Sequence, residues 1–232
     1  MNLRMPICFC LATLLAPVSA HAQGTFQNLN FELANPVSVG NPAEPNAVTA
    51  ASAFPGWELY AGNVQLTQVN FNDPDTGMTT VGLVGPNSPD FPAIDGNYSV
   101  LLQGGVTASG ASISQTGVIP RSTESLLFDA QAQQGVGLQH ILQVSIGGQI
   151  ISFVALSTGP TYTEYGATIS AWAGDSEPLT FTAPEVSVGL NNWTIDDISF
   201  STQSIPEPSP LVLTGLGAFV FALYRRFAPK RP

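Results

Sequence analysis

The sequence contains very little cysteine, and both cysteines lie close to the N-terminus. Of its 232 residues only Cys8 and Cys10 are cysteine, and both fall within the first 22 residues. We expect that segment to be removed on export, so the mature chain would contain no thiol. Such a chain forms no disulfide, although export permits one, and it offers neither a thiolate metal ligand nor a cysteine nucleophile.

Histidine is equally scarce, and this argues against hydrolytic enzymes. His21 lies in the same N-terminal segment, which leaves His140 as the one histidine of the predicted mature chain. A serine triad needs a histidine base, and the sequence has no G-x-S-x-G motif. Asp196 and Asp197 are adjacent, and adjacent strand residues point to opposite faces, so they do not form a matched glycosidase pair. We therefore predict that the protein is not an enzyme and interpret His140 as a strand residue that faces water or is partly buried.

Positive charge is almost confined to the two ends of the chain. Of six lysines and arginines, one lies near the N-terminus, four lie in residues 225–231, and only Arg121 lies between them. All sixteen acidic residues lie between Glu32 and Glu207, where they oppose that one arginine, a formal charge of −15. Such a surface repels nucleic-acid phosphates and anionic lipid headgroups, so we expect no nucleic-acid partner. The acids could recruit divalent cations, although a solvated acidic surface is the simpler interpretation.

Residues 1–22 have the pattern of a secretory signal peptide. One arginine gives a positive start, a short apolar centre follows, and Ala20 and Ala22 frame an A-x-A cleavage motif. The alternative, a buried N-terminal helix, is disfavoured because two prolines would interrupt it. We expect signal peptidase to cut before Gln23, so that the mature chain is exported.

The body of the chain, residues 23–203, is predicted to be all-β. Short apolar runs separated by Gly, Pro, Asn, Ser and Thr recur along it, and no stretch shows a sustained helical stripe. Gly147 and Gly148 sit between two alternating runs, which indicates a two-residue hairpin. Many short strands at this spacing favour a single antiparallel β-sandwich, or jelly roll. The expected strands cover residues 63–71, 98–104, 111–119, 125–133, 141–156, 178–183 and 186–201.

Loops hold the candidates for ligand binding. Residues 34–53 and 72–95 are rich in proline and small residues and are interpreted as long loops, which gather at the ends of a sandwich. Aromatic residues on strands more often belong to a core, but Trp57, Tyr162 and Tyr165 fall outside the expected strands. Because aromatic rings stack on the C–H faces of sugars, we expect these three residues to bind carbohydrate.

Five short motifs follow one another along the body: NLNFE (28–32), PGWELY (55–60), DGNYSVLLQ (95–103), SISQT (112–116) and WTIDDISF (193–200). In this order they resemble galactose-binding-like jelly rolls, the fold of many carbohydrate-binding modules. The resemblance implies a carbohydrate-binding jelly roll. It also implies a structural calcium ion that joins the first strand to the last through Glu32 and Asp197.

The last of these motifs supports an acidic site for a physical reason. Strict alternation puts either Asp196 or Asp197 among apolar neighbours, and burying an unpaired carboxylate is costly. The carboxylate therefore needs a cation, a hydrogen-bond cluster or a bulge that turns it outward. Scarce basic residues favour backbone N–H donors or a metal such as calcium, which takes oxygen ligands. An edge bulge with both aspartates in water remains the alternative.

Residues 204–232 end the chain with an apolar segment between a proline motif and a basic cluster. The apolar segment, 209–224, is a short transmembrane helix at most, because the fourteen residues from Leu211 rise about 21 Å against a hydrocarbon core of about 30 Å. The positive-inside rule would keep the basic cluster, 225–231, in the cytoplasm. The residues that mark this end are Pro206, Glu207 and Pro208 before the segment, and Arg225 and Arg226 after it.

This tail closely resembles the PEP-CTERM sorting signal. The resemblance implies export by a Gram-negative bacterium, transient anchoring in the inner membrane, and processing by the membrane enzyme exosortase. The mature form would then be extracellular or on the cell surface. Because such bacteria often make exopolysaccharide, we expect a non-enzymatic matrix or biofilm component that binds carbohydrate. A secreted polysaccharide-active hydrolase and a purely structural surface protein remain open alternatives.

Overall fold

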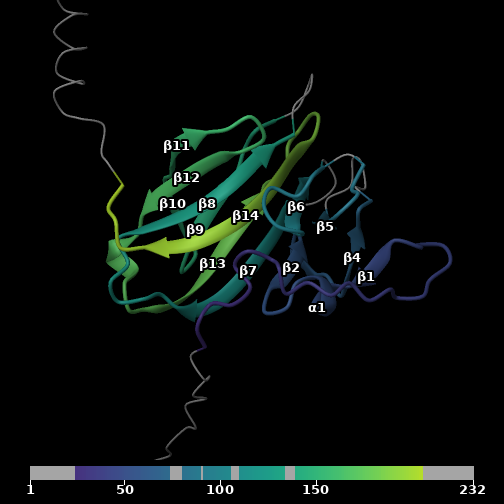
Figure 1. Ribbon diagram of the computed structural model, residues 1–232, viewed down its shortest axis with the longest axis horizontal. Coiled ribbons are helices and arrows are strands. Elements are labelled where there is room, and N and C mark those ends of the chain that lie inside the picture. The colour runs from purple at the N-terminus through teal and green to yellow at the C-terminus, as the bar shows by residue number, and fades with distance from the viewer. Residues whose placement is uncertain (1–23, 74–79, 90, 106–109, 134–138, 206–232) are drawn as a thin grey trace, which may run out of the picture.

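The computed structural model describes residues 24–73, 80–89, 91–105, 110–133 and 139–205 (Figure 1). The predicted signal peptide with its cleavage site lies outside these ranges, as do the sorting motif, the apolar segment and the basic cluster after residue 205. Those features therefore stay predictions. No helix within the described ranges is long and apolar enough to cross a membrane.

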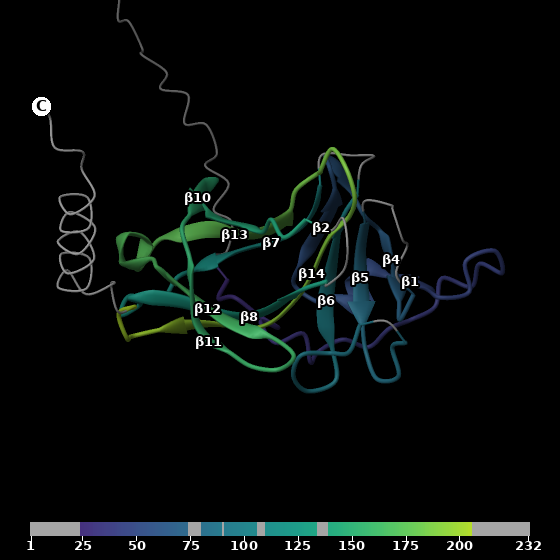
Figure 2. The same cartoon turned by 90° about the horizontal axis from the view of Figure 1, so that it is seen from above.

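The body is nearly all-β and its strands form two sheets, which confirms the predicted β-sandwich in outline. Figure 2 shows the sheets as two layers, with β13 and β7 in one and β8 and β12 in the other. The larger sheet has the order β1 (Ala47–Thr49), β4 (Gln68–Phe71), β5 (Thr80–Val84), β6 (Ser99–Gly104), β14 (Asn191–Ser201), β8 (Ser125–Ala132), β12 (Thr163–Thr168), β11 (Val154–Thr158). The smaller sheet has the order β10 (Gln149–Ile151), β9 (Gln143–Ile146), β13 (Ser176–Ala183), β7 (Ala111–Val118), β2 (Glu58–Ala61), β3 (Val64–Gln65).

The predicted glycine hairpin is present. Gly147 and Gly148 join β9 to β10 and have φ angles of 59° and 79°, which suit a tight turn that matches the twist of the strands. Strand β7 alternates between buried and more exposed positions, as its sequence predicts. The helical elements within the described residues are short: α1 (Ala50–Ala53) and the 3-10 turn η1 (Ser170–Trp172).

Two details of the predicted architecture are wrong. The sandwich is not purely antiparallel, because β4 and β5 pair in parallel, with Asn70 opposite Gly82. Asn72 starts the connection in the left-handed region at φ 54°, and its Oδ1 accepts a hydrogen bond from Gly85 N. The two segments interpreted as loops also contain β1, α1 and the buried strand β5. Proline and glycine near β5 hid a short apolar run that the sheet buries.

The core lies between the two sheets and contains two groups of aromatic rings. Near one end Phe31 packs against Trp57, with ring centroids 5.7 Å apart. Further along, Phe128 of the larger sheet contacts Phe181 of the smaller sheet at 5.2 Å and stacks on Tyr165 at 5.4 Å. Full burial of one such apolar side chain contributes about 1.5–3 kcal/mol. These ring contacts hold the two sheets together.

Candidate functional site

Trp57 is a core residue, so its predicted role in ligand binding is wrong. Its side chain is only 6 % exposed, and its Nε1–H donates a 3.0 Å hydrogen bond to the carbonyl of Asn28. The ring therefore has no free face on which a sugar could stack. Trp57 precedes β2 directly, and the loop from the N-terminal segment covers it.

The other two predicted binding residues, Tyr162 and Tyr165, line one cavity. The cavity has a volume of about 390 Å³ and lies where β8, β12 and β14 approach the turn between β11 and β12. We call it the tyrosine pocket. Besides the two tyrosines, its lining includes His140, Trp193 and the threonines at 158, 161 and 163.

The rings in the tyrosine pocket are held in place by the core beneath them. Tyr165 stacks on Phe128 with an interplanar angle of 21° and meets the buried Trp193 edge-on at 6.4 Å. Tyr162 is half-buried and sits on the turn, where its carbonyl accepts a 2.9 Å hydrogen bond from Gly159 N. The ring of Tyr165 is thus fixed by its neighbours at the base of the pocket. The ring of Tyr162 is the one that a ligand can approach.

His140 and Trp193 also line this pocket, although neither was predicted to bind a ligand. His140 lies just before β9 and is exposed, with Nε2 3.0 Å from the carbonyl of Gln133. Because a carbonyl only accepts, Nε2 carries the proton in this contact, and the neutral ring keeps Nδ1 as an acceptor. Nothing local in the sequence marks these residues, because they meet Tyr162 only through the pairing of distant strands.

A row of carboxylates crosses the outer face of the larger sheet beside this pocket. Asp129 of β8 is directly opposite Asp196 on one side and Glu164 on the other. Asp129, Glu164 and Asp197 line a second cavity of about 290 Å³. Burial, together with the charges of Asp197, Glu164 and Asp95, raises the pKa of Asp129 to about 6. The charge of Asp129 has the largest effect on Tyr162. Together with burial and the charges of Asp95, Asp197 and Glu164, it raises the pKa of Tyr162.

A β-bulge decides which of the adjacent aspartates is buried. The register between β14 and β8 shifts between Asp196 and Ser199, and Asp197 adopts the left-handed region at φ 47°. Asp197 is thereby turned into solvent, while Asp196 is 1 % exposed. Asp196 accepts hydrogen bonds from Ser99 Oγ at 2.6 Å, Asp197 N at 2.8 Å and Asp95 N at 3.3 Å. Burial nevertheless raises its pKa to about 7.

Glu32 clamps the segment that covers Asp196. Its carboxylate accepts hydrogen bonds from Asn97 N at 2.7 Å, Asn97 Nδ2 at 2.9 Å and Tyr98 N at 2.9 Å. Burial by itself would raise the pKa of Glu32, but these hydrogen bonds outweigh it and lower the pKa. Gly96 beside these hydrogen bonds has a φ of 55°, so a larger residue there would be strained, and its Cβ would lie 2.5 Å from Glu32 Oε1 and displace the carboxylate.

Glu32 and Asp197, the two residues predicted to bind calcium, are close enough for their charges to interact, but they do not belong to a cluster of metal ligands. The pKa of Asp197 is raised by burial and then by the charges of Asp95 and Glu32. Glu32, however, already accepts three N–H donors. Across the described ranges no group of three or more His, Cys, Asp or Glu side chains is arranged to hold a metal ion. The described residues thus offer no ready-made cluster of acidic ligands at this place, and calcium binding stays a prediction.

Comparison with known proteins gives only distant similarity. No protein-family model and no curated protein matches the chain. A cyclase from Fischerella sp. TAU, solved with 4-(1H-indol-3-yl)butan-2-one, is 14 % identical with a TM-score of 0.47, covering 81 % of this chain and 100 % of the cyclase. The K2 cleaved adhesin domain of Lys-gingipain is 12 % identical with a TM-score of 0.43, covering 74 % of this chain and 95 % of the domain. Similarity at this level bears on no activity or ligand.

Proposed function

We propose that this chain is an exported, exosortase-processed protein that acts as a non-enzymatic component of an extracellular matrix and binds neutral carbohydrate weakly. In this proposal the sandwich is a jelly roll and the tyrosine pocket is its binding site. One observation carries the binding proposal: Tyr162, Tyr165 and three threonines line the same cavity.

The tyrosine pocket offers both kinds of contact that a sugar needs. Tyr162 provides an accessible ring for the apolar C–H face of a sugar. The threonine hydroxyls and His140 provide donors and acceptors for its hydroxyl groups. Each such hydrogen bond replaces one with water and contributes about 1 kcal/mol. We therefore expect affinities between micromolar and millimolar, made effective by many copies on one matrix.

Charge favours neutral over acidic polysaccharides. The carboxylates lie near the tyrosine pocket, and the charge of Asp129, with burial and the charges of Asp95, Asp197 and Glu164, raises the pKa of Tyr162. A uronate or sulfate group at this site would meet repulsion rather than a basic partner.

The proposal for export rests on the sequence motifs at the two ends of the chain. The carbonyl of Gln203 accepts a 2.7 Å hydrogen bond from Ser125 Oγ, and Glu124 N donates to the carbonyl of Ser201 at 2.8 Å. Ile205 packs at Gly166, where an added Cβ would lie 2.5 Å from its Cδ1. The chain is therefore packed on the body at least as far as Ile205, the residue that precedes the Pro-Glu-Pro motif in the sequence.

A hydrolase is the second candidate, and the carboxylate row is what favours it. Asp129 and Glu164 are cross-strand partners at the 290 Å³ cavity, so their Cβ atoms are about 5 Å apart. Retaining glycosidases hold their two carboxyl groups about 5–5.5 Å apart, and side chains on Cβ atoms this close can reach that spacing through their rotamers. With its pKa near 6, Asp129 would act as the acid and Glu164 as the nucleophile.

One experiment separates the two candidates. The purified chain is applied to immobilised exopolysaccharide and to a glycan array, and the release of reducing ends is measured over the same period. Retention without new reducing ends supports the binding protein. Turnover that Asp129→Asn abolishes would instead establish the hydrolase, and neither retention nor turnover would leave a purely structural surface protein.

A further inference from the structure

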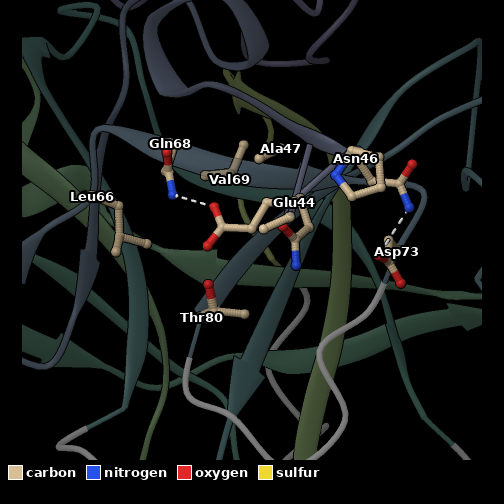
Figure 3. Close-up of a pocket in the computed structure, with 11 residues that line it drawn as sticks. Glu44, Asn46, Ala47, Leu66, Gln68, Val69, Asp73 and Thr80 are labelled. Carbon is tan, nitrogen blue, oxygen red and sulfur yellow. Dashed lines mark hydrogen bonds between the residues drawn. The ribbon is translucent and has the colours of Figure 1, made fainter. Parts of the chain in front are cut away.

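A third cavity lies at the opposite edge of the larger sheet from the tyrosine pocket. It has a volume of about 390 Å³ and is formed between the segment that leads into β1 and the strands β4 and β5 (Figure 3). We call it the Glu44–Asp73 pocket. Its lining includes Glu44, Asn46, Leu66, Gln68, Asp73 and Thr80.

The side chains of this pocket are held in position before any ligand arrives. Glu44 Oε2 accepts a hydrogen bond from Gln68 Nε2 at 2.9 Å, and Asp73 Oδ2 accepts one from Asn46 Nδ2 at 2.9 Å. Backbone hydrogen bonds fix the same segment, from Ala47 N to the carbonyl of Glu44 and from Phe71 N to the carbonyl of Asn46. Figure 3 shows the two carboxylates on different sides of the hollow. Such preorganisation lowers the entropy cost of binding.

The chemistry of this lining differs from that of the tyrosine pocket. The lining contains two carboxylates, three amide side chains and a threonine, with no aromatic ring and no basic side chain among its residues. A ligand therefore gains little from stacking here. It gains from hydrogen bonds to amides and carboxylates, and it gains most if it carries a positive charge.

The ligand that fits this lining is polar, hydroxylated and cationic. The amides and Thr80 suit the hydroxyl groups of a sugar ring, and Leu66 gives a small apolar contact for its C–H face. Glu44 and Asp73 suit an ammonium group, which donates up to three hydrogen bonds. A bare divalent cation fits less well, because no cluster of three metal-ligating side chains exists among the described residues.

We propose that the Glu44–Asp73 pocket binds the amine-bearing sugar units of a polysaccharide, as a site separate from the tyrosine pocket. The two pockets share no lining residue, and β1 and β11, beside which they lie, are the two edge strands of one sheet. One molecule can therefore contact two glycan segments and cross-link them. The proposal rests on the extracellular, carbohydrate-rich setting proposed above, but it does not depend on binding at the tyrosine pocket.

The test compares two probes of equal length: an oligomer of glucosamine, which has free amines, and the corresponding oligomer of N-acetylglucosamine. Affinities of the purified full chain are measured by calorimetry at low and high salt. We expect Glu44→Gln and Asp73→Asn each to weaken binding of the amine oligomer about fivefold, as does high salt. Binding of the acetylated oligomer should be unchanged by either variant.

The control variant is Glu185→Gln, which removes one negative charge from an exposed site outside both pockets. Equal losses in Glu185→Gln and Glu44→Gln would overturn the proposal, because net charge alone would then explain the binding. Equal affinity of the wild type for both oligomers, or no binding of the amine oligomer, would also overturn it. Tyr162→Ala distinguishes the proposed site in the Glu44–Asp73 pocket from the one in the tyrosine pocket. This variant should weaken binding of the acetylated oligomer and leave binding of the amine oligomer unchanged. If Glu44→Gln lowers the melting temperature, its affinity for the amine oligomer is not interpreted. The affinity of Asp73→Asn, which removes the other carboxylate of the pocket, then gives the result.

Discussion

Ser99 Oγ donates a 2.6 Å hydrogen bond to the carboxylate of Asp196, and both side chains are fully covered on the outer face of the larger sheet. The segment that carries Asp95 covers them, and Glu32 clamps that segment in turn. A carboxylate that ionises in this position must give up most of its hydration. The pKa of Asp196 is therefore raised, and the stability of the fold becomes dependent on pH.

We predict that the free energy of unfolding falls as pH rises from about 4 to about 7. The pKa of Asp196 is about 7 in the folded protein against an ordinary value of 3.8, and that of Asp129 is about 6. The folded state thus binds more protons than the unfolded state in this window, and stability is lost as pH rises through the folded pKa. The loss due to Asp196 should stay below about 4 kcal/mol.

Urea unfolding at a series of pH values measures this dependence. Asp196→Asn should flatten most of the slope, since the amide keeps the shape of the side chain but cannot ionise. Asp175→Asn, at an exposed site, serves as the matched control. If Asp196→Asn keeps the slope of the wild type, another group carries the pH dependence.

We predict that mutation of Tyr162 weakens carbohydrate binding without loss of the fold. Tyr162→Ala should reduce retention on neutral exopolysaccharide about fivefold or more, because one stacking ring is removed from a weak site. Tyr60→Ala removes a tyrosine of β2 in the other sheet and should leave retention unchanged. Affinity electrophoresis with melting curves as a folding check measures both. Wild-type retention by Tyr162→Ala would exclude the tyrosine pocket as the binding site.

Calcium binding is predicted from the resemblance to carbohydrate-binding jelly rolls and from the acidic motif that contains Asp196 and Asp197. An ion that binds only the folded state stabilises it by RT ln(1 + [L]/Kd), about 2.7 kcal/mol at a hundredfold excess over Kd. Melting the protein with calcium and with a chelator measures the effect. If calcium binds at Glu32 and Asp197, then Asp197→Asn should remove the shift. Equal midpoints in both solutions would mean that the hydrogen bonds to Glu32 and the bulge at Asp197 need no metal.

Processing is expected at both ends of the chain. Native protein should begin near Gln23, because Ala20 and Ala22 frame a signal-peptidase site, and it should lack the apolar segment and basic cluster after Pro208. Mass spectrometry of extracellular material from the host fixes both termini. Replacing Glu207 by glutamine should leave the tail attached if exosortase reads the motif. Recovery of the intact C-terminal peptide from mature wild-type protein would contradict the prediction.

The class of fold and its local turns could be predicted from the amino-acid sequence. The alternation in β7 and the glycine pair between β9 and β10 depend only on neighbouring residues, because side chains alternate along a strand and glycine accepts positive φ wherever a tight turn needs it. The predicted strands of the second half of the chain are accordingly present.

Which polar and aromatic side chains are accessible depends on how distant parts of the chain pack together. Asp196 is buried and Asp197 exposed only because β14 bulges against β8. Trp57 is covered by a segment near Asn28, and the tyrosine pocket joins His140 to Tyr162 across strands that are distant in sequence. Local patterns report the periodicity of a strand, but exposure depends on what packs over it. The partners that cover or complete a site come from elsewhere in the chain, so only the fold brings them together.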